Sequence, residues 1–148
     1  MAEPVELADF PIIIKLPILW GDMDAFRHVN NTVSFRWFES SRIAYLEQTE
    51  MEVQLDQQNL SPILASTTCN YRLQLRYPDT VWIGARIGRL GRSSITMEHA
   101  VYSHQLQAIA AEGTAVVVVF NYRTNRPTRI PADVRAAAEK AEGKSFDT

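Results

Sequence analysis

The segment from Val33 to Leu46 carries apolar side chains around most of a helical surface. Asn30 and Asn31 precede it. An asparagine caps a helix well, because its side-chain oxygen accepts a hydrogen bond from an unpaired backbone amide. The apolar residues cover far more than the roughly 100° stripe of a surface helix. We therefore expect a helix that begins near Asn31 and that the rest of the chain surrounds. A narrow polar edge remains at Arg36, Glu39, Ser40 and Glu47.

Most of the remaining chain is rich in β-branched and large apolar residues, which favour strands. Short polar breaks separate these runs, and short breaks favour antiparallel pairing of consecutive strands. A polar connection from Gln54 to Asn59 follows the long helix, and an alanine-rich segment predicts a terminal helix from Ala132 to Glu142. The expected strands are Ile12 to Leu19, Leu64 to Arg76, Thr80 to Arg89, Ser94 to Ser103 and Ala108 to Asn121.

These elements predict an α+β fold in which a curved antiparallel five-stranded sheet wraps around a long central helix. The chain has 148 residues, the size of one domain, and we expect a single domain over residues 1–148. The edges of so small a sheet usually need a partner, so a homodimer is the expected assembly.

The composition excludes several classes of partner. The net charge is -2 and the pI about 5.9, which does not provide the basic field that nucleic acid or an anionic membrane requires. The apolar runs are shorter than the ~20 residues of a membrane-spanning helix. Cys69 is the single cysteine and cannot form an intrachain disulfide, and the first residues lack the pattern of a secretory signal. We therefore expect a soluble, cytoplasmic protein.

Reactive side chains are concentrated where the first strand ends and the long helix begins. The first turn of a helix presents unpaired amides and the positive end of the helix dipole, which together stabilise an oxyanion that develops on an attacked carbonyl. A carboxylate a few residues upstream can then act as a base or a nucleophile. The cluster consists of Asp22, Asp24, His28, Asn30 and Asn31.

Simpler roles exist for the same residues. Asp22, Asn30 and Asn31 are of types that commonly form turns and caps, and Asp24 could brace the loop. A metal site on Asp22, Asp24 and His28 is the other alternative, although one histidine and two carboxylates are a weak metal signal. We expect no metal.

The run from Trp20 to Asn31, followed by Phe35-Arg-Trp-Phe-Glu39-Ser-Ser-Arg42, closely resembles the 4-hydroxybenzoyl-CoA thioesterase family of hotdog-fold proteins. Weaker similarities continue through Gly88 to Ser94 and from Asn125 to Pro131. The resemblance therefore covers roughly Ile12 to Pro131. It implies the hotdog fold, in which the sheet curls around the central helix.

The resemblance also implies an activity, namely hydrolysis of an acyl-CoA thioester. Asp24 matches the catalytic aspartate, and the backbone amide of Asn31 is the candidate oxyanion donor, with His28 and Asn30 positioning these groups. The family's active site forms between two subunits and needs no cofactor, since coenzyme A is part of the substrate. The assembly would be a homodimer, with a dimer of dimers as a further step. Residues expected to contact coenzyme A are Arg92, Ser93, and Arg126 or Arg129.

Several positions depart from the pattern or have competing explanations. Arg27 stands where related sequences usually have glycine, and Gln74 where many have proline. The Arg27 side chain could reach the acyl pocket or a substrate carboxylate and alter specificity, but a side chain that points into solvent is the expectation we favour. Glu39 is a second carboxylate, but a surface ion pair with Arg42 at i+3 explains it equally well. His99 shares a strand face with apolar residues, which favours a core histidine.

Two other functions stay open. The acyl group could be carried on acyl carrier protein, which has the same pantetheine arm, or the protein could bind acyl-CoA without hydrolysing it. The acyl group itself is not specified, because Trp37, Phe38 and Tyr71 could line a pocket or pack in the core.

Overall fold

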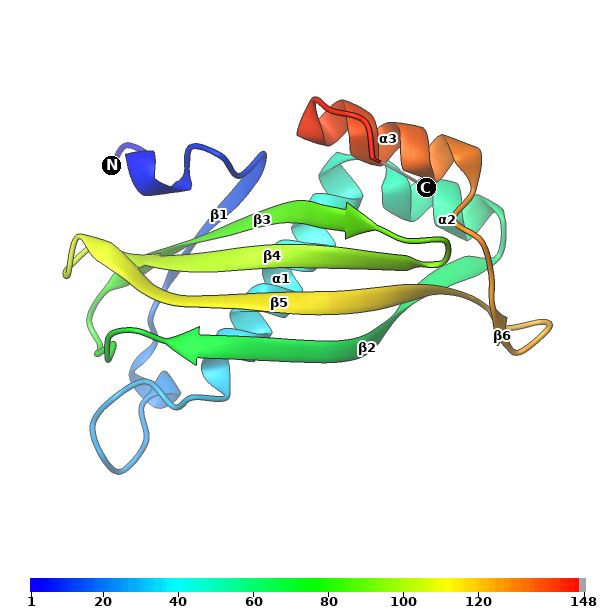
Figure 1. Cartoon of the computed structure of the whole chain (residues 1–148). Coiled ribbons are helices and arrows are strands. Elements are labelled where there is room, and N and C mark those ends of the chain that lie inside the picture. Colours follow the sequence, from blue (N-terminus) through cyan, green and yellow to red (C-terminus); the bar gives the residue numbers. More distant parts are fainter. Residues whose placement is uncertain (147–148) are drawn as a thin grey trace.

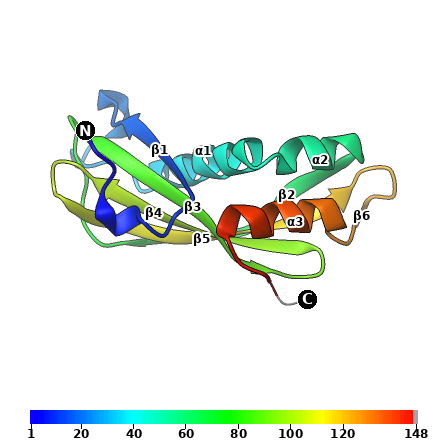
Figure 2. The same ribbon diagram turned by 90° about the horizontal axis from the view of Figure 1, so that it is seen from above.

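A computed structural model describes residues 1–146. The strands form one antiparallel sheet in the order β1-β3-β4-β5-β2, with β6 added beside β5 (Figure 1). The helices α1, α2 and α3 lie on one side of this sheet, and the N-terminal turn η1 lies on the other (Figure 2). The elements are η1 Val5–Leu7, β1 Ile12–Pro17, η2 Trp20–Asp22, α1 Val33–Gln48, α2 Met51–Gln57, β2 Leu60–Tyr71, β3 Thr80–Leu90, β4 Ser94–Ser103, β5 Ala108–Asn121, β6 Arg126–Pro127 and α3 Ala132–Glu142.

The central helix is covered as its apolar surface predicts. Trp37, Phe38 and Tyr45 are at most 5% exposed and pack against the sheet, whose alternating residues supply the other half of the core. The α+β hotdog architecture expected from the sequence is therefore confirmed. Within the described residues, no helix is long and apolar enough to cross a membrane.

Two elements differ from the expectation. Most of the segment from Gln54 to Asn59, predicted as a polar connection, belongs to the second half of α2, a helix that buries Met51 and Leu55 at i and i+4. The strand predicted from Leu64 to Arg76 runs instead from Leu60 to Tyr71. Pro62 does not end it, because β2 pairs with β5 alone and an edge strand tolerates a proline.

Arg42 also differs from its expected place. It is 8% exposed and faces the core side of α1, and no ion pair with Glu39 is present among residues 1–146. Burial lowers the pKa of the Arg42 guanidinium, and the charge of Glu39 opposes this change. The predicted surface ion pair is therefore wrong.

Gly113 allows α1 to approach the sheet closely. A Cβ at this position of β5 would lie 2.2 Å from the Thr68 carbonyl oxygen and 2.5 Å from the Phe38 ring. We expect Gly113→Ala to lower the free energy of unfolding by about 1–3 kcal/mol, because neither neighbour can move freely in a packed core. Urea denaturation measures this change. Gly21→Ala, where nothing lies within 4 Å of the added carbon, is the control. Equal stabilities of the two variants would contradict the prediction.

His99 is a core residue, as its strand position predicts. Its side chain is 2% exposed, Nδ1 lies 3.2 Å from the Gly84 carbonyl oxygen, and its ring stacks on Phe38 at 5.0 Å. Burial lowers the pKa of His99 to about 4, and the nearby Arg42 charge acts in the same direction.

This pKa makes stability depend on pH. The unfolded state binds a proton near pH 6.5 and the folded state only near pH 4, so the contribution of neutral His99 is fully present above about pH 6.5 and is lost as the pH falls toward 4. Between about pH 7.5 and about pH 5, we expect the wild type to lose about 2 kcal/mol more unfolding free energy than His99→Asn. Urea denaturation at both pH values measures the difference, and parallel losses would contradict it.

Candidate active site

The chain between η2 and α1 forms a tight loop that presents Asp24. The loop is closed by a bridge between Met23 and Val29, and the Asp24 amide donates to the His28 carbonyl at 3.0 Å. The Arg27 amide in turn donates to the Asp24 carbonyl at 2.9 Å. These backbone bonds hold the loop at the end of the sheet where β2 ends (Figure 1).

One oxygen of Asp24 has a structural role. Oδ1 accepts a hydrogen bond from the Phe26 amide at 2.9 Å, which is the loop-bracing role considered above. No partner for Oδ2 is found among residues 1–146. The half-buried Asp24 lines a hollow of about 480 Å³, so a carboxylate oxygen remains available to a ligand there.

The start of α1 forms the opposite wall of this hollow. The helix begins at Val33, and Asn30 Oδ1 accepts from the Thr32 amide at 2.9 Å and from the Thr32 hydroxyl at 3.0 Å. The Asn30 amide donates to the Asp22 carbonyl at 2.9 Å. The Asn31 amide has no acceptor in the described part of the chain. Asn30 therefore organises the helix start, and Asn31, whose N–H lacks a described acceptor, lines the hollow.

Tyr71, at the end of β2, orients the Asn31 peptide. Its hydroxyl donates to the Asn31 carbonyl oxygen. Burial raises the pKa of Tyr71 to about 12, and the neighbouring Cys69 adds to this rise, so the phenol stays a hydrogen-bond donor at neutral pH. Burial also raises the pKa of the Cys69 thiol, against the effect of hydrogen bonds with Tyr71 and Ser34. Cys69 therefore lacks the thiolate character of a nucleophile.

The segment after β2, predicted as strand, forms another wall of the hollow. The amides of Arg72 and Leu73 both donate to the Ala110 carbonyl. The Val29 amide donates to the Leu75 carbonyl at 2.8 Å. Arg76 Nη2 lies 3.0 Å from His28 Nε2. Sequence reasoning missed Arg76, because no local pattern indicates a contact with His28 across 48 residues.

The residues expected to contact coenzyme A phosphates lie at the other end of the sheet. The Ser93 carbonyl accepts from the Val119 amide of β5 and the Arg92 carbonyl from the Ile130 amide, both at 2.8 Å, which joins the β3–β4 turn to β5 and to the segment after β6. Arg126 is in β6 beside this turn (Figure 1). One chain therefore groups Arg92, Ser93 and Arg126 together, but far from Asp24.

Other predicted candidates lie outside the hollow. Trp37 and Phe38 are core residues, and the exposed Glu39 makes no described ion pair. No three His, Cys, Asp or Glu side chains of residues 1–146, Asp22, Asp24 and His28 included, lie together as a metal site would require.

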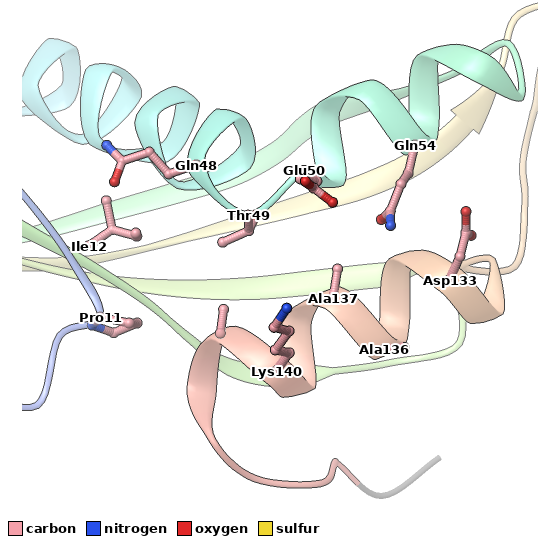
Figure 3. A pocket seen from close by; sticks show the side chains of 11 residues that line it. Pro11, Ile12, Gln48, Thr49, Glu50, Gln54, Asp133, Ala136, Ala137 and Lys140 are labelled. Carbon is pink, nitrogen blue, oxygen red and sulfur yellow. The ribbon is translucent and has the colours of Figure 1, made fainter.

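A larger hollow, of about 670 Å³, lies between the end of α1, α2 and α3. Figure 3 shows Gln54 and Lys140 pointing toward it from opposite helices. It contains no residue of the reactive cluster, and its size alone does not indicate chemistry.

Comparison with known proteins agrees with the fold. The family model of the thioesterase-like superfamily matches residues 18–138, so this chain belongs to that superfamily. The PA2801 protein of Pseudomonas aeruginosa is 32% identical, with a TM-score of 0.75 over 86% of this chain and 98% of its own. A Thermus thermophilus thioesterase, solved with coenzyme A and Zn, is 26% identical, with a TM-score of 0.75 over 93% of this chain and 98% of its own.

A curated relative, the uncharacterized protein YsmA of Bacillus subtilis, is 27% identical over 90 residues. This match covers 61% of the present chain and 60% of YsmA, so the chain spans less than two thirds of that relative.

Proposed function

We propose that this protein hydrolyses acyl-CoA thioesters in the manner of the 4-hydroxybenzoyl-CoA thioesterase family. The observation that carries the proposal is that Asp24 and Asn31, whose amide has no acceptor among residues 1–146, line one hollow at the amino end of α1. The coenzyme A bound to the Thermus thermophilus relative supports coenzyme A as the carrier. Membership of the thioesterase-like superfamily supports the reaction class.

In the proposed reaction, the thioester carbonyl lies between Asp24 and the start of α1. Asp24 either removes a proton from the water that attacks the carbonyl carbon, or attacks that carbon itself to form an anhydride that water then hydrolyses. In both routes the Asn31 amide stabilises the oxyanion, the C–S bond breaks, and the thiolate leaves with the electron pair. In one turnover in labelled water, label in Asp24 supports the anhydride, and label only in the product acid supports the general base.

A second copy would complete this site. Within residues 1–146, no strand pairs with the outer side of edge strand β2, and Ile43 and Leu64, both 45% exposed, flank a groove between α1 and β2. The buried Arg42 lines the same groove. These features favour an isologous dimer in which the β2 strands of two chains meet.

The direction of β2 gives this dimer a functional consequence. A twofold axis across antiparallel β2 edges places the Tyr71 end of one chain beside the Leu60 end of the other. The Leu60 end is the end that holds β6 and the β3–β4 turn (Figure 1). Arg92, Ser93 and Arg126 of one chain would then lie toward the Asp24 hollow of its partner, where they could bind the phosphates of coenzyme A.

Thiol release from a panel of short, long and aromatic acyl-CoA esters tests the proposal. We expect turnover of at least one ester, and slower turnover of the same acyl group on acyl carrier protein. Faster turnover of the acyl carrier protein thioester would make acyl carrier protein, and not coenzyme A, the proposed carrier. Tight binding of acyl-CoA without thiol release would instead favour a binding module.

A further inference from the structure

Asp24 lies between two hollows. In addition to the hollow at the start of α1, it lines a second one of about 370 Å³. A thioester carbonyl has two arms, the acyl group and the pantetheine, so a carbonyl held at Asp24 needs space on two sides. The second hollow is lined by Trp20, Met23, Asp24, Arg27, Arg76 and Tyr77.

The second hollow carries two guanidinium groups and one carboxylate. Arg27 and Arg76 are exposed, and neither forms an ion pair with a carboxylate in the part of the chain that the structure describes. Among the described residues that line it, Asp24 alone is acidic, so their net charge is positive. Guanidinium groups bind carboxylates through charge-assisted hydrogen bonds.

A left-handed backbone places Arg27, and a side-chain contact places Arg76. Arg27 has φ 64°, a left-handed conformation that glycine adopts without steric strain and arginine does not. A side chain retained at a strained position beside a reactive group points to a function of that side chain. Arg76 also lines the second hollow, and its Nη2 lies 3.0 Å from His28 Nε2. The other N–H groups of the Arg76 guanidinium remain for a ligand.

From this arrangement we infer that the preferred acyl group carries a carboxylate at its far end, as in the monothioester of a short dicarboxylic acid, and that Arg27 and Arg76 bind this carboxylate. The inference rests on the proposed thioesterase function and names its substrate class. The phosphates of coenzyme A are the other anionic groups of such a substrate. The whole pantetheine arm separates them from the thioester, so they reach a hollow that contains Asp24 less easily than the acyl group does.

The test compares kcat/KM for glutaryl-CoA with kcat/KM for pentanoyl-CoA, whose acyl group has the same number of carbon atoms but no charge. We expect the wild type to prefer glutaryl-CoA, and Arg27→Gly and Arg76→Gln each to lower the glutaryl-to-pentanoyl ratio by roughly tenfold. The ratio cancels any general loss of activity, and Arg27→Gly also relieves the left-handed backbone. Arg123→Gln, an exposed arginine of the β5–β6 turn, should leave the ratio unchanged.

Thioesters of the same acyl groups with N-acetylcysteamine, which has no phosphate, distinguish binding of the acyl carboxylate from binding of the coenzyme A phosphates. A charge preference that persists on this carrier supports the acyl carboxylate. An arginine effect that is equal for both CoA esters and absent on N-acetylcysteamine assigns the arginines to the phosphates and overturns the inference. Equal turnover of glutaryl-CoA and pentanoyl-CoA by the wild type also overturns it, while thioesterase activity itself would stand.

Binding to Asp24→Asn, measured by calorimetry, makes the test independent of turnover. Tighter binding of glutaryl-CoA than of pentanoyl-CoA, lost in the Arg27→Gly background, supports the inference even if no ester is hydrolysed. Equal affinities for the two esters overturn it.

Discussion

Asp24→Asn is expected to lower kcat/KM for the best thioester by about 10²–10⁴, because an amide can neither accept the proton of water nor attack the carbonyl. Its oxygen can still accept the hydrogen bond that the Phe26 amide donates to Asp24 Oδ1, so the loop should keep its shape. Thiol release under saturating and limiting substrate measures the loss, and calorimetry with acyl-CoA measures whether binding is retained.

Asp22→Asn is the matched control for this variant. Asp22, the last residue of η2, is also a half-buried carboxylate, and its Oδ2 accepts from the Leu19 amide at 2.8 Å, a bond that asparagine can keep. We expect activity close to that of the wild type. Similar losses in both variants would indicate that the loop, and not the Asp24 carboxylate, carries the effect.

Leu64→Asp is expected to separate the proposed dimer and to abolish most of the activity. It places a charge on edge strand β2, in the groove that Ile43 and Arg42 line. Because the exposed apolar surface of Leu64 and Ile43 would be buried between the two chains, we expect the dissociation constant of the dimer to rise by at least about 100-fold. Light scattering after gel filtration gives the mass, and thiol release from the same fractions gives the activity.

Leu106→Asp is the control, since Leu106 is 47% exposed, close to the 45% of Leu64, but lies in the β4–β5 turn. It should change neither the mass nor the activity. A fully active monomeric Leu64→Asp variant would contradict a site shared between two chains. A dimeric Leu64→Asp variant would contradict the β2 interface.

The sequence indicated the elements whose signals are local. The bounds of β4, β5 and α3 agree with the prediction at every end, and α1 begins within two residues of Asn31. These signals are the apolar periodicity of a helix, the composition of strands and the residues of turns, and all act between near neighbours in the chain. The same holds for the cluster from Asp22 to Asn31, which is contiguous and therefore visible before folding.

Only the tertiary structure decided which distant residues join this cluster. Tyr71 reaches the Asn31 carbonyl, Arg76 reaches His28, and the segment after Tyr71 becomes a wall of the hollow instead of a strand. It also decided that Pro62 lies within an edge strand and that Arg42 is buried. These outcomes depend on sheet order and on the packing of α1 against the strands. Such contacts form between segments far apart in sequence, so no local pattern of residues specifies them.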